Sequence, residues 1–233
     1  MRAAPAIIAC GTAVLCAVLA LLVPSLALAH DVARGDRAFV AATHGPALVP
    51  FLYLGAKHMV TGIDHILFLI GVVMFLHRLR DVVLYVSMFT IGHSLTLMLG
   101  VLFHTSANTH LVDAIIGLSI VYKGADNLGL LRSIGWWLDT RIAVFAFGLC
   151  HGLGLATKLL SLSLSSRGLV PNLVSFNLGV ELGQILVLAV VVGLLDLWRR
   201  RSWFAPAMNG VNWLLIAAGA VIMFNQTSEY LAA

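Results

Sequence analysis

Long apolar runs separated by short polar segments dominate the pattern of this chain. A helix that crosses a membrane needs roughly 20 apolar residues to span about 30 Å of hydrocarbon. We therefore predict an all-α integral membrane protein with six transmembrane helices, at residues 58–77, 82–103, 110–131, 139–159, 173–197 and 208–227. Residues 46–57, which contain Pro46, Pro50 and Gly55, are expected to form a short interfacial or re-entrant lead-in to the first of them.

An earlier apolar run, at the start of the chain, has the features of a secretory signal peptide. Arg2 gives it a positive start, Pro24 ends its apolar part, and Ala27-Leu28-Ala29 supplies the small residues of a cleavage site. An uncleaved first transmembrane helix is the alternative. The expected organisation is a signal peptide over 1–29, an extracytoplasmic segment over 30–57 and a six-helix membrane domain over 58–233.

Arginines set the predicted orientation. They gather in the loops after the first, third and fifth predicted helices, at Arg78, Arg80, Arg132, Arg141 and Arg199 to Arg201, whereas the alternate loops contain only Arg167. Because cytoplasmic loops collect Lys and Arg, we expect a bacterial inner-membrane protein with both mature termini in the periplasm.

Composition then excludes the soluble classes of protein. Apolar residues make up 61% of the chain, charged residues 10%, and the mean hydropathy is +1.00. Soluble domains have about 45–50% apolar and about 25% charged residues. The net charge of +4 is small and arises from the loops, so a nucleic-acid partner is not expected. Signal cleavage would leave Cys150 as the single cysteine, which excludes an intramolecular disulfide.

Ionisable residues inside the predicted helices are the candidate functional groups, because a charge in hydrocarbon is costly unless it is paired, solvated or bound to a metal. Two segments, 89–97 and 147–155, share the pattern F-x-x-x-H-x-L-x-L. With a rise of about 1.5 Å per residue, the candidates lie in the outer half of the bilayer. The predicted metal ligands are His58, Asp64, His65, His93, His151 and Glu181.

Four further residues are candidate additional ligands, and three of them have a structural alternative. His30 would become the mature N-terminus, where the α-amine and the imidazole together can chelate a metal. Asp126 could instead pair with Lys123, and Asn177 and Gln184 could form interhelical hydrogen bonds. Histidine and carboxylate ligands without paired cysteines suit a borderline divalent metal such as nickel, cobalt, zinc or copper(II).

Four sequence blocks resemble the HupE/UreJ family of membrane proteins, which are often encoded with hydrogenase or urease accessory functions. The blocks are Gly55-x-x-His58-x-x-x-Gly62-x-Asp64-His65-x-Leu-Phe68, Phe89-Thr-x-x-His93-Ser-Leu-Thr-Leu97, Phe147-Gly-Leu-x-His151-Gly-Leu-Gly154 and Phe176-Asn-x-Gly179-Val-Glu181-x-Gly-Gln184. The resemblance implies a signal peptide, six membrane helices, nickel or cobalt transport, and hydrogenase or urease machinery as partners. The H-x5-D-H spacing is one residue longer than the similar H-x4-D-H motif of nickel/cobalt transporters.

The leading hypothesis is a permease that takes Ni²⁺ or Co²⁺ from the periplasmic side through an intramembrane His/Asp/Glu site. One alternative is a membrane-embedded metalloenzyme, either a zinc-dependent lipid hydrolase or a copper or iron oxidase, since three histidines and a carboxylate can form a catalytic metal site. Another is an assembly factor for a metalloenzyme. We find no nucleotide-binding motif, so transport would be channel-like or coupled to an ion.

Overall fold

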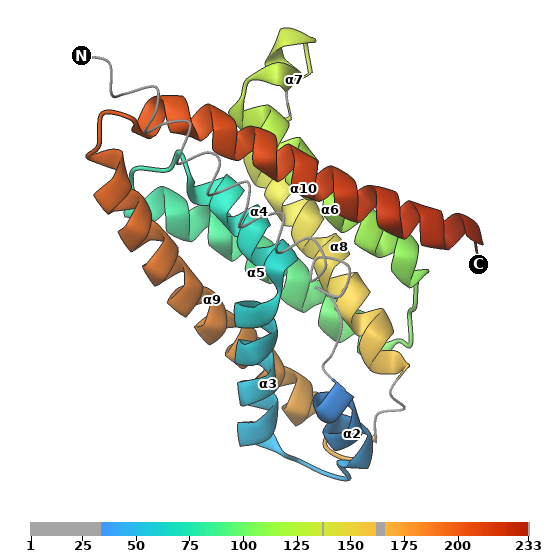
Figure 1. Ribbon diagram of the computed structural model, residues 1–233. Helices are drawn as coiled ribbons and strands as arrows, with labels where there is room; N and C mark the ends of the chain where they lie inside the picture. The colour runs from blue at the N-terminus through green and yellow to red at the C-terminus, as the bar shows by residue number, and fades with distance from the viewer. Residues whose placement is uncertain (1–33, 137, 162–165, 233) are drawn as a thin grey trace.

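The computed structural model describes residues 34–136, 138–161 and 166–232, and all the regular structure in these ranges is helical. The predicted signal peptide and His30 lie outside the described residues. The helices, shown in Figure 1, are α2 (Arg34–Ala42), α3 (Leu48–Thr61), α4 (Ile63–Val73), α5 (Leu79–Leu102), α6 (Thr109–Asn127), α7 (Leu130–Ser133), α8 (Thr140–Leu160), α9 (Leu169–Arg199) and α10 (Phe204–Ala232).

Four of the described helices, α5, α8, α9 and α10, are long and apolar enough to cross a membrane. The pair α3 and α4 is apolar and long enough only when the two helices are taken together, and their angle of 64° makes the pair either one broken span or a re-entrant loop. Helix α6 is not in this set. It has 19 residues and contains three charged ones, Asp113, Lys123 and Asp126. The chain is therefore a helical protein with the features of a membrane protein.

Three helix pairs form the body of the molecule, and each pair has a definite direction. Helices α3 and α9 are parallel, since Leu48 contacts Ser175 and the backbone of Leu52 lies against Gly179. Helices α5 and α8 are also parallel, with Gly148 against Phe89 and Gly152 against His93.

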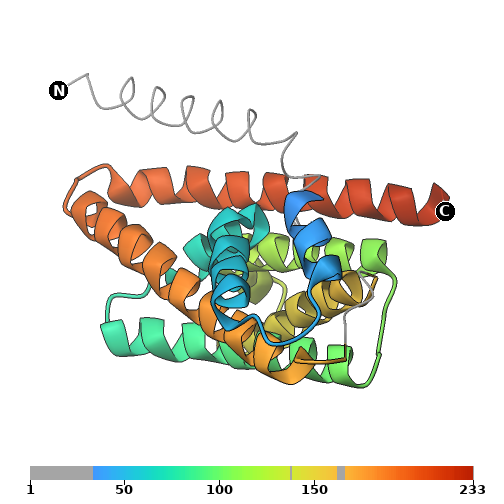
Figure 2. The same ribbon diagram turned by 90° about the horizontal axis from the view of Figure 1, so that it is seen from below.

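Helices α6 and α10 run in opposite directions. His110, near the start of α6, bonds Gln226 near the end of α10, while Gly124 lies against the backbone of Asn212. Figure 2 shows α10 along one side of the molecule and α5 along the opposite side.

Helix α4 is the short interior element between these pairs, and eight of its eleven residues are buried. It contacts α3, α5, α6, α9 and α10. The break before it falls at Gly62, inside the predicted helix 58–77 rather than at the end of the predicted lead-in. Residues 48–61 are one continuous helix, because Pro50 lies in its first turn, where a missing N–H breaks no helical hydrogen bond.

Gly62 has an extended backbone, with φ −71° and ψ 98°, and its N–H donates to the His58 carbonyl. A Cβ at this position would lie 2.7 Å from His65 Nδ1 and 2.9 Å from the His58 carbonyl oxygen. The chain therefore needs glycine at the break, so that the His65 ring can approach the backbone closely.

Candidate metal centre

Five of the six predicted ligands come together in the interior of the molecule. His58 is on α3, Asp64 and His65 are in the first turn of α4, His93 is on α5 and His151 is on α8. Asp64 is 2% exposed, His65 is 1% exposed, and His93 and His151 are fully buried. His58 is half-buried.

The five side chains form two groups of three that share His65. In the first group, one ligand atom from each of His58, His65 and His93 lies within 4.8 Å of the others. The second group, made by Asp64, His65 and His151, meets the same limit. The His65 ring centroid is 5.0 Å from that of His58 and 5.0 Å from that of His151, so this ring lies at the centre of the cluster.

Local hydrogen bonds orient two of the rings. His151 Nδ1 lies 2.8 Å from the Phe147 carbonyl oxygen, one turn earlier on α8. Because a carbonyl can only accept, Nδ1 carries the proton and Nε2 is the nitrogen with the lone pair. His65 Nδ1 lies 3.3 Å from Asp64 Oδ1, a carboxylate–imidazole contact of the kind that fixes ring orientation at metal sites.

Phenylalanine rings enclose the histidines. Phe89 lies 5.0 Å from His151 and 6.1 Å from His65 between ring centroids, Phe68 is 5.9 Å from His151, and Phe176 is 6.1 Å from His58. The apolar rings give the buried histidines low-dielectric surroundings, in which electrostatic attraction is stronger than in water.

The sequence spacing already relates these rings to the histidines. Phe89 and Phe147 precede His93 and His151 by four residues, and Phe68 follows His65 by three. Both spacings place the two side chains on one face of a helix.

The shared pattern of α5 and α8 has a structural reason. The two helices pack in parallel with Gly148 and Gly152 directly against the α5 backbone, which leaves no space for a Cβ at either position. Since His93 and His151 occupy the same place in the repeated pattern, this register brings both imidazoles to the same level of the bundle.

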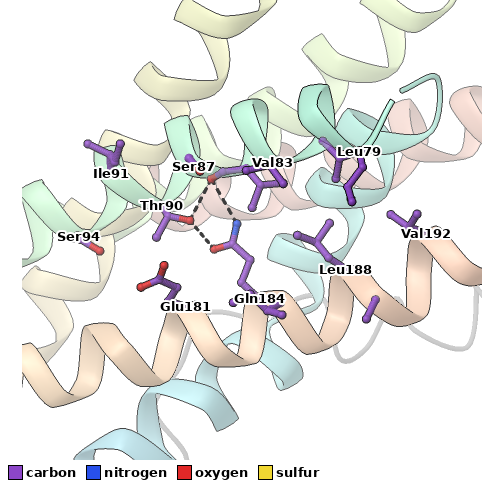
Figure 3. A pocket seen from close by; sticks show the side chains of 14 residues that line it. Leu79, Val83, Ser87, Thr90, Ile91, Ser94, Glu181, Gln184, Leu188 and Val192 are labelled. Carbon is purple, nitrogen blue, oxygen red and sulfur yellow. Dashed lines mark hydrogen bonds between the residues drawn. The ribbon is translucent and has the colours of Figure 1, made fainter. Parts of the chain in front are cut away.

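Glu181, the sixth predicted ligand, belongs to neither group of three. It is exposed on α9 and lines a groove of about 720 Å³ between α5 and α9. Figure 3 shows Glu181 and Gln184 pointing from α9 toward Thr90 on α5. Thr90 Oγ1 donates to Gln184 Oε1 at 2.7 Å, so Gln184 takes part in an interhelical hydrogen bond.

The remaining candidates also lie outside the two groups. Asp126 Oδ2 accepts from Lys123 Nζ at 2.7 Å, which is the ion pair considered as its alternative role. Both amide atoms of Asn177 are buried and form no hydrogen bond with the described residues.

The donor set fits a borderline divalent metal. Two nitrogen ligands on one tetrahedral ion lie about 3.3 Å apart, so shifts of about 1–2 Å would close either group around an ion. Four imidazoles and one carboxylate, without a thiolate, match the ligand preferences of nickel, cobalt, zinc and copper(II). The described residues can therefore hold such an ion at the shared histidine, His65.

A comparison with models of protein families gives a match for this chain. The family model described as HupE / UreJ protein matches residues 34–232, which is most of the chain and confirms the resemblance seen in the four sequence blocks. Comparisons with curated proteins and with solved structures gave no match.

Proposed function

The chain belongs to the HupE/UreJ family, and from this membership together with the buried histidine cluster we propose that it is a membrane permease for a divalent transition metal. Nickel or cobalt is the proposed cargo, because the family resemblance implies these metals and the donor set suits them. The observation that carries the proposal is the convergence of His58, Asp64, His65, His93 and His151 from four helices.

The two overlapping groups support a path for the ion. His58, the half-buried member, belongs to the first group, whereas Asp64, His65 and His151 are all buried. An ion that enters beside His58 can exchange His58 and His93 for Asp64 and His151 without losing His65. Keeping one ligand throughout lowers the cost of each exchange, since the ion is never left bare in hydrocarbon.

The proposed topology has six crossings, with α3 and α4 as one broken span and α6 as the third. Six alternating crossings require the first and fifth to be parallel, the second and fourth to be parallel, and the third and sixth to be antiparallel. The directions of α3 and α9, α5 and α8, and α6 and α10 agree with this requirement.

Ion pairs support the inclusion of α6. Asp113 pairs with Lys158 of α8 at 2.8 Å, and Lys123 pairs with Asp126, so the three charged residues of α6 have partners.

The proposal includes a cleaved signal over 1–29, a segment over 30–57, a membrane domain over 58–233 and a bacterial inner-membrane location with both mature termini in the periplasm. Hydrogenase or urease machinery would receive the metal.

Metal uptake by proteoliposomes tests the proposal. We expect His65→Ala to lower the initial rate of Ni²⁺ or Co²⁺ uptake by at least about tenfold, because loss of a residue around a metal commonly costs 10–100-fold in affinity. His58→Ala and His151→Ala should each lower it by less, since each belongs to one group only.

His77→Ala is the matched control, because His77 is an exposed histidine in the loop before α5. It should transport at the rate of the unmodified chain. Equal uptake by the His65 and His77 variants would contradict the proposal.

The metalloenzyme alternative makes a different prediction about the same residues. The His151 Nδ1 contact with a carbonyl is typical of a ligand held for a resident metal. A catalytic site would retain about one ion per chain through detergent purification, whereas a permease releases its cargo. Metal analysis of the purified protein therefore separates the two functions.

A further inference from the structure

A second cavity, of about 660 Å³, lies at the end of the bundle where α5 and α8 begin and α6 ends. Figure 1 shows α7 projecting from this end. Its lining includes Tyr85, Tyr122, Asp126, Arg132, Trp136 and Arg141, and none of its lining residues belongs to the histidine cluster. The inference from it rests on the proposed orientation in the membrane and not on the transport of a metal.

The carboxylates of the cavity already have partners. Asp126 Oδ2 accepts from Lys123 Nζ at 2.7 Å and from Thr140 Oγ1 at 3.4 Å. Asp139 Oδ1 accepts from the Arg141 backbone N–H at 2.8 Å and caps the start of α8. Among the described residues, neither Asp126 nor Asp139 pairs with an arginine side chain.

The two guanidinium groups of the cavity are available. Neither Arg132 nor Arg141 forms a side-chain hydrogen bond or an ion pair with another described residue, and both are exposed. Guanidinium groups bind phosphate in a bidentate manner, with charge-assisted hydrogen bonds. The cavity therefore offers two planar donors for an anion with several oxygens.

The other lining residues indicate that such an anion belongs to a lipid at the membrane–water interface. Tyr85, Tyr122 and Trp136 provide amphipathic rings, which are typical of the membrane–water interface. Leu131 and Leu138 add apolar surface. The arginine-rich loops at positions 78–80 and 199–201 adjoin the ends of helices α5 and α9, and basic pockets between helices on the cytoplasmic side of a membrane bind anionic lipid head groups.

We propose that this cavity binds a phosphate group through Arg132 and Arg141, and that the phosphate belongs to the head group of a membrane phospholipid. The aromatic rings hold the glycerol region, and the leucines contact the start of the acyl chains. A free phosphate ester has the same recognition chemistry and is distinguished by the experiment.

The test measures the thermal stability of the detergent-purified full chain against increasing phosphatidylglycerol, diacylglycerol or inorganic phosphate. We expect phosphatidylglycerol to stabilise the protein at lower concentrations than diacylglycerol, which lacks the phosphate. The double variant Arg132→Gln/Arg141→Gln should raise the half-saturating phosphatidylglycerol concentration by at least about tenfold, as expected for the loss of charged hydrogen bonds.

The matched control is Arg78→Gln/Arg201→Gln, which removes the same charge from exposed positions outside the cavity. It should leave the half-saturating concentration within about twofold, since exposed charges act weakly at a distance. The variant Arg132→Lys/Arg141→Lys keeps the charge and should bind phosphatidylglycerol with intermediate strength. Such graded binding would show that the weaker binding of the glutamine variant does not come from a folding defect.

Two outcomes would overturn the proposal. One is equal weakening in the cavity and control variants, and the other is equal stabilisation by diacylglycerol and phosphatidylglycerol. Saturation by inorganic phosphate with no further effect of phosphatidylglycerol would support the phosphate site and assign it to a soluble phosphate compound.

Discussion

Gly62 is the residue that most directly controls the geometry of the histidine cluster. It ends α3, begins the turn into α4 and lies against the His65 ring. Since His65 belongs to both groups of three, a displacement of this ring changes both at once.

We predict that Gly62→Ala weakens metal binding by roughly 10–100-fold, the range for changes that misplace a metal ligand. The added methyl group would lie 2.7 Å from His65 Nδ1, so the ring must move. Isothermal titration of the purified protein with Ni²⁺ or Co²⁺ measures the effect.

Gly193→Ala is the control for this substitution, because a methyl group at Gly193 of α9 meets no atom within 4 Å. It should bind the metal as the unmodified chain does. Unchanged affinity in the Gly62 variant would show that the position of His65 tolerates the added methyl group and that this account of Gly62 is wrong.

Residue types and helical spacing were sufficient to predict five members of the cluster. The position of Glu181 needed the tertiary structure, because a helical pattern defines which residues share a face and leaves open what that face contacts. Glu181 shares a stripe with Gln184, and this stripe borders the groove with Thr90.

At the scale of elements, α4 depends on an arginine from the far end of α9. Arg199 Nη2 donates to the carbonyl oxygens of Val73, Met74 and Leu76 at 3.1, 2.9 and 2.7 Å. These carbonyls lie at and just beyond the end of α4, where a helix leaves its last carbonyls without helical N–H donors; the Val73 carbonyl also accepts from the Leu76 N–H at 3.0 Å. Arg199 thereby holds the short helix that carries Asp64 and His65.

We predict that Arg199→Gln lowers the melting temperature of the detergent-purified protein by roughly 5–10 °C, since charged hydrogen bonds to buried carbonyls are lost. Differential scanning fluorimetry measures the shift. Arg200→Gln is the control, because Arg200 is exposed and its partner is the exposed Asp196, and it should change the melting temperature by about 2 °C at most. Similar shifts in both variants would show that Arg199 has no special role.

The expected helices and the observed ones agree in place but differ in their ends. The apolar runs predicted helices over 82–103, 139–159, 173–197 and 208–227, and α5, α8, α9 and α10 cover nearly all of these ranges. Apolar periodicity does not predict the break at Gly62, because the break depends on the contact between Gly62 and the His65 ring. The sequence likewise indicates only a loop charge at Arg199, because its contacts with the carbonyls after α4 join residues far apart in the chain.

At the scale of the whole molecule, the three helix pairs have the directions that six alternating crossings need. In the proposed topology, the loop after α5 and the loop before α5 lie on opposite sides of the membrane. The same topology would put the loop between α9 and α10 on the side of the loop before α5.

Cysteine labelling tests this topology in a variant with Cys10, Cys16 and Cys150 replaced by alanine. In intact spheroplasts, a membrane-impermeant maleimide should label Ser106→Cys and should not label Arg80→Cys or Ser202→Cys, since Lys and Arg mark the cytoplasmic side. Permeabilised cells should label all three and provide the control. Labelling of Ser106→Cys and Arg80→Cys from the same side would contradict a single crossing by α5.

The sequence by itself determined the helical, membrane-like class of this protein, its family and the chemistry of its candidate ligands. These properties follow from composition, from apolar run length and from which residue types lie inside the runs, all of which are local. Only the tertiary structure decided that His65 is shared by two groups, that Glu181 borders a separate groove, and that Arg132 and Arg141 line a second cavity. These arrangements depend on which helices pack together, in which direction and at what rotation, and contacts between residues far apart in the chain set all three.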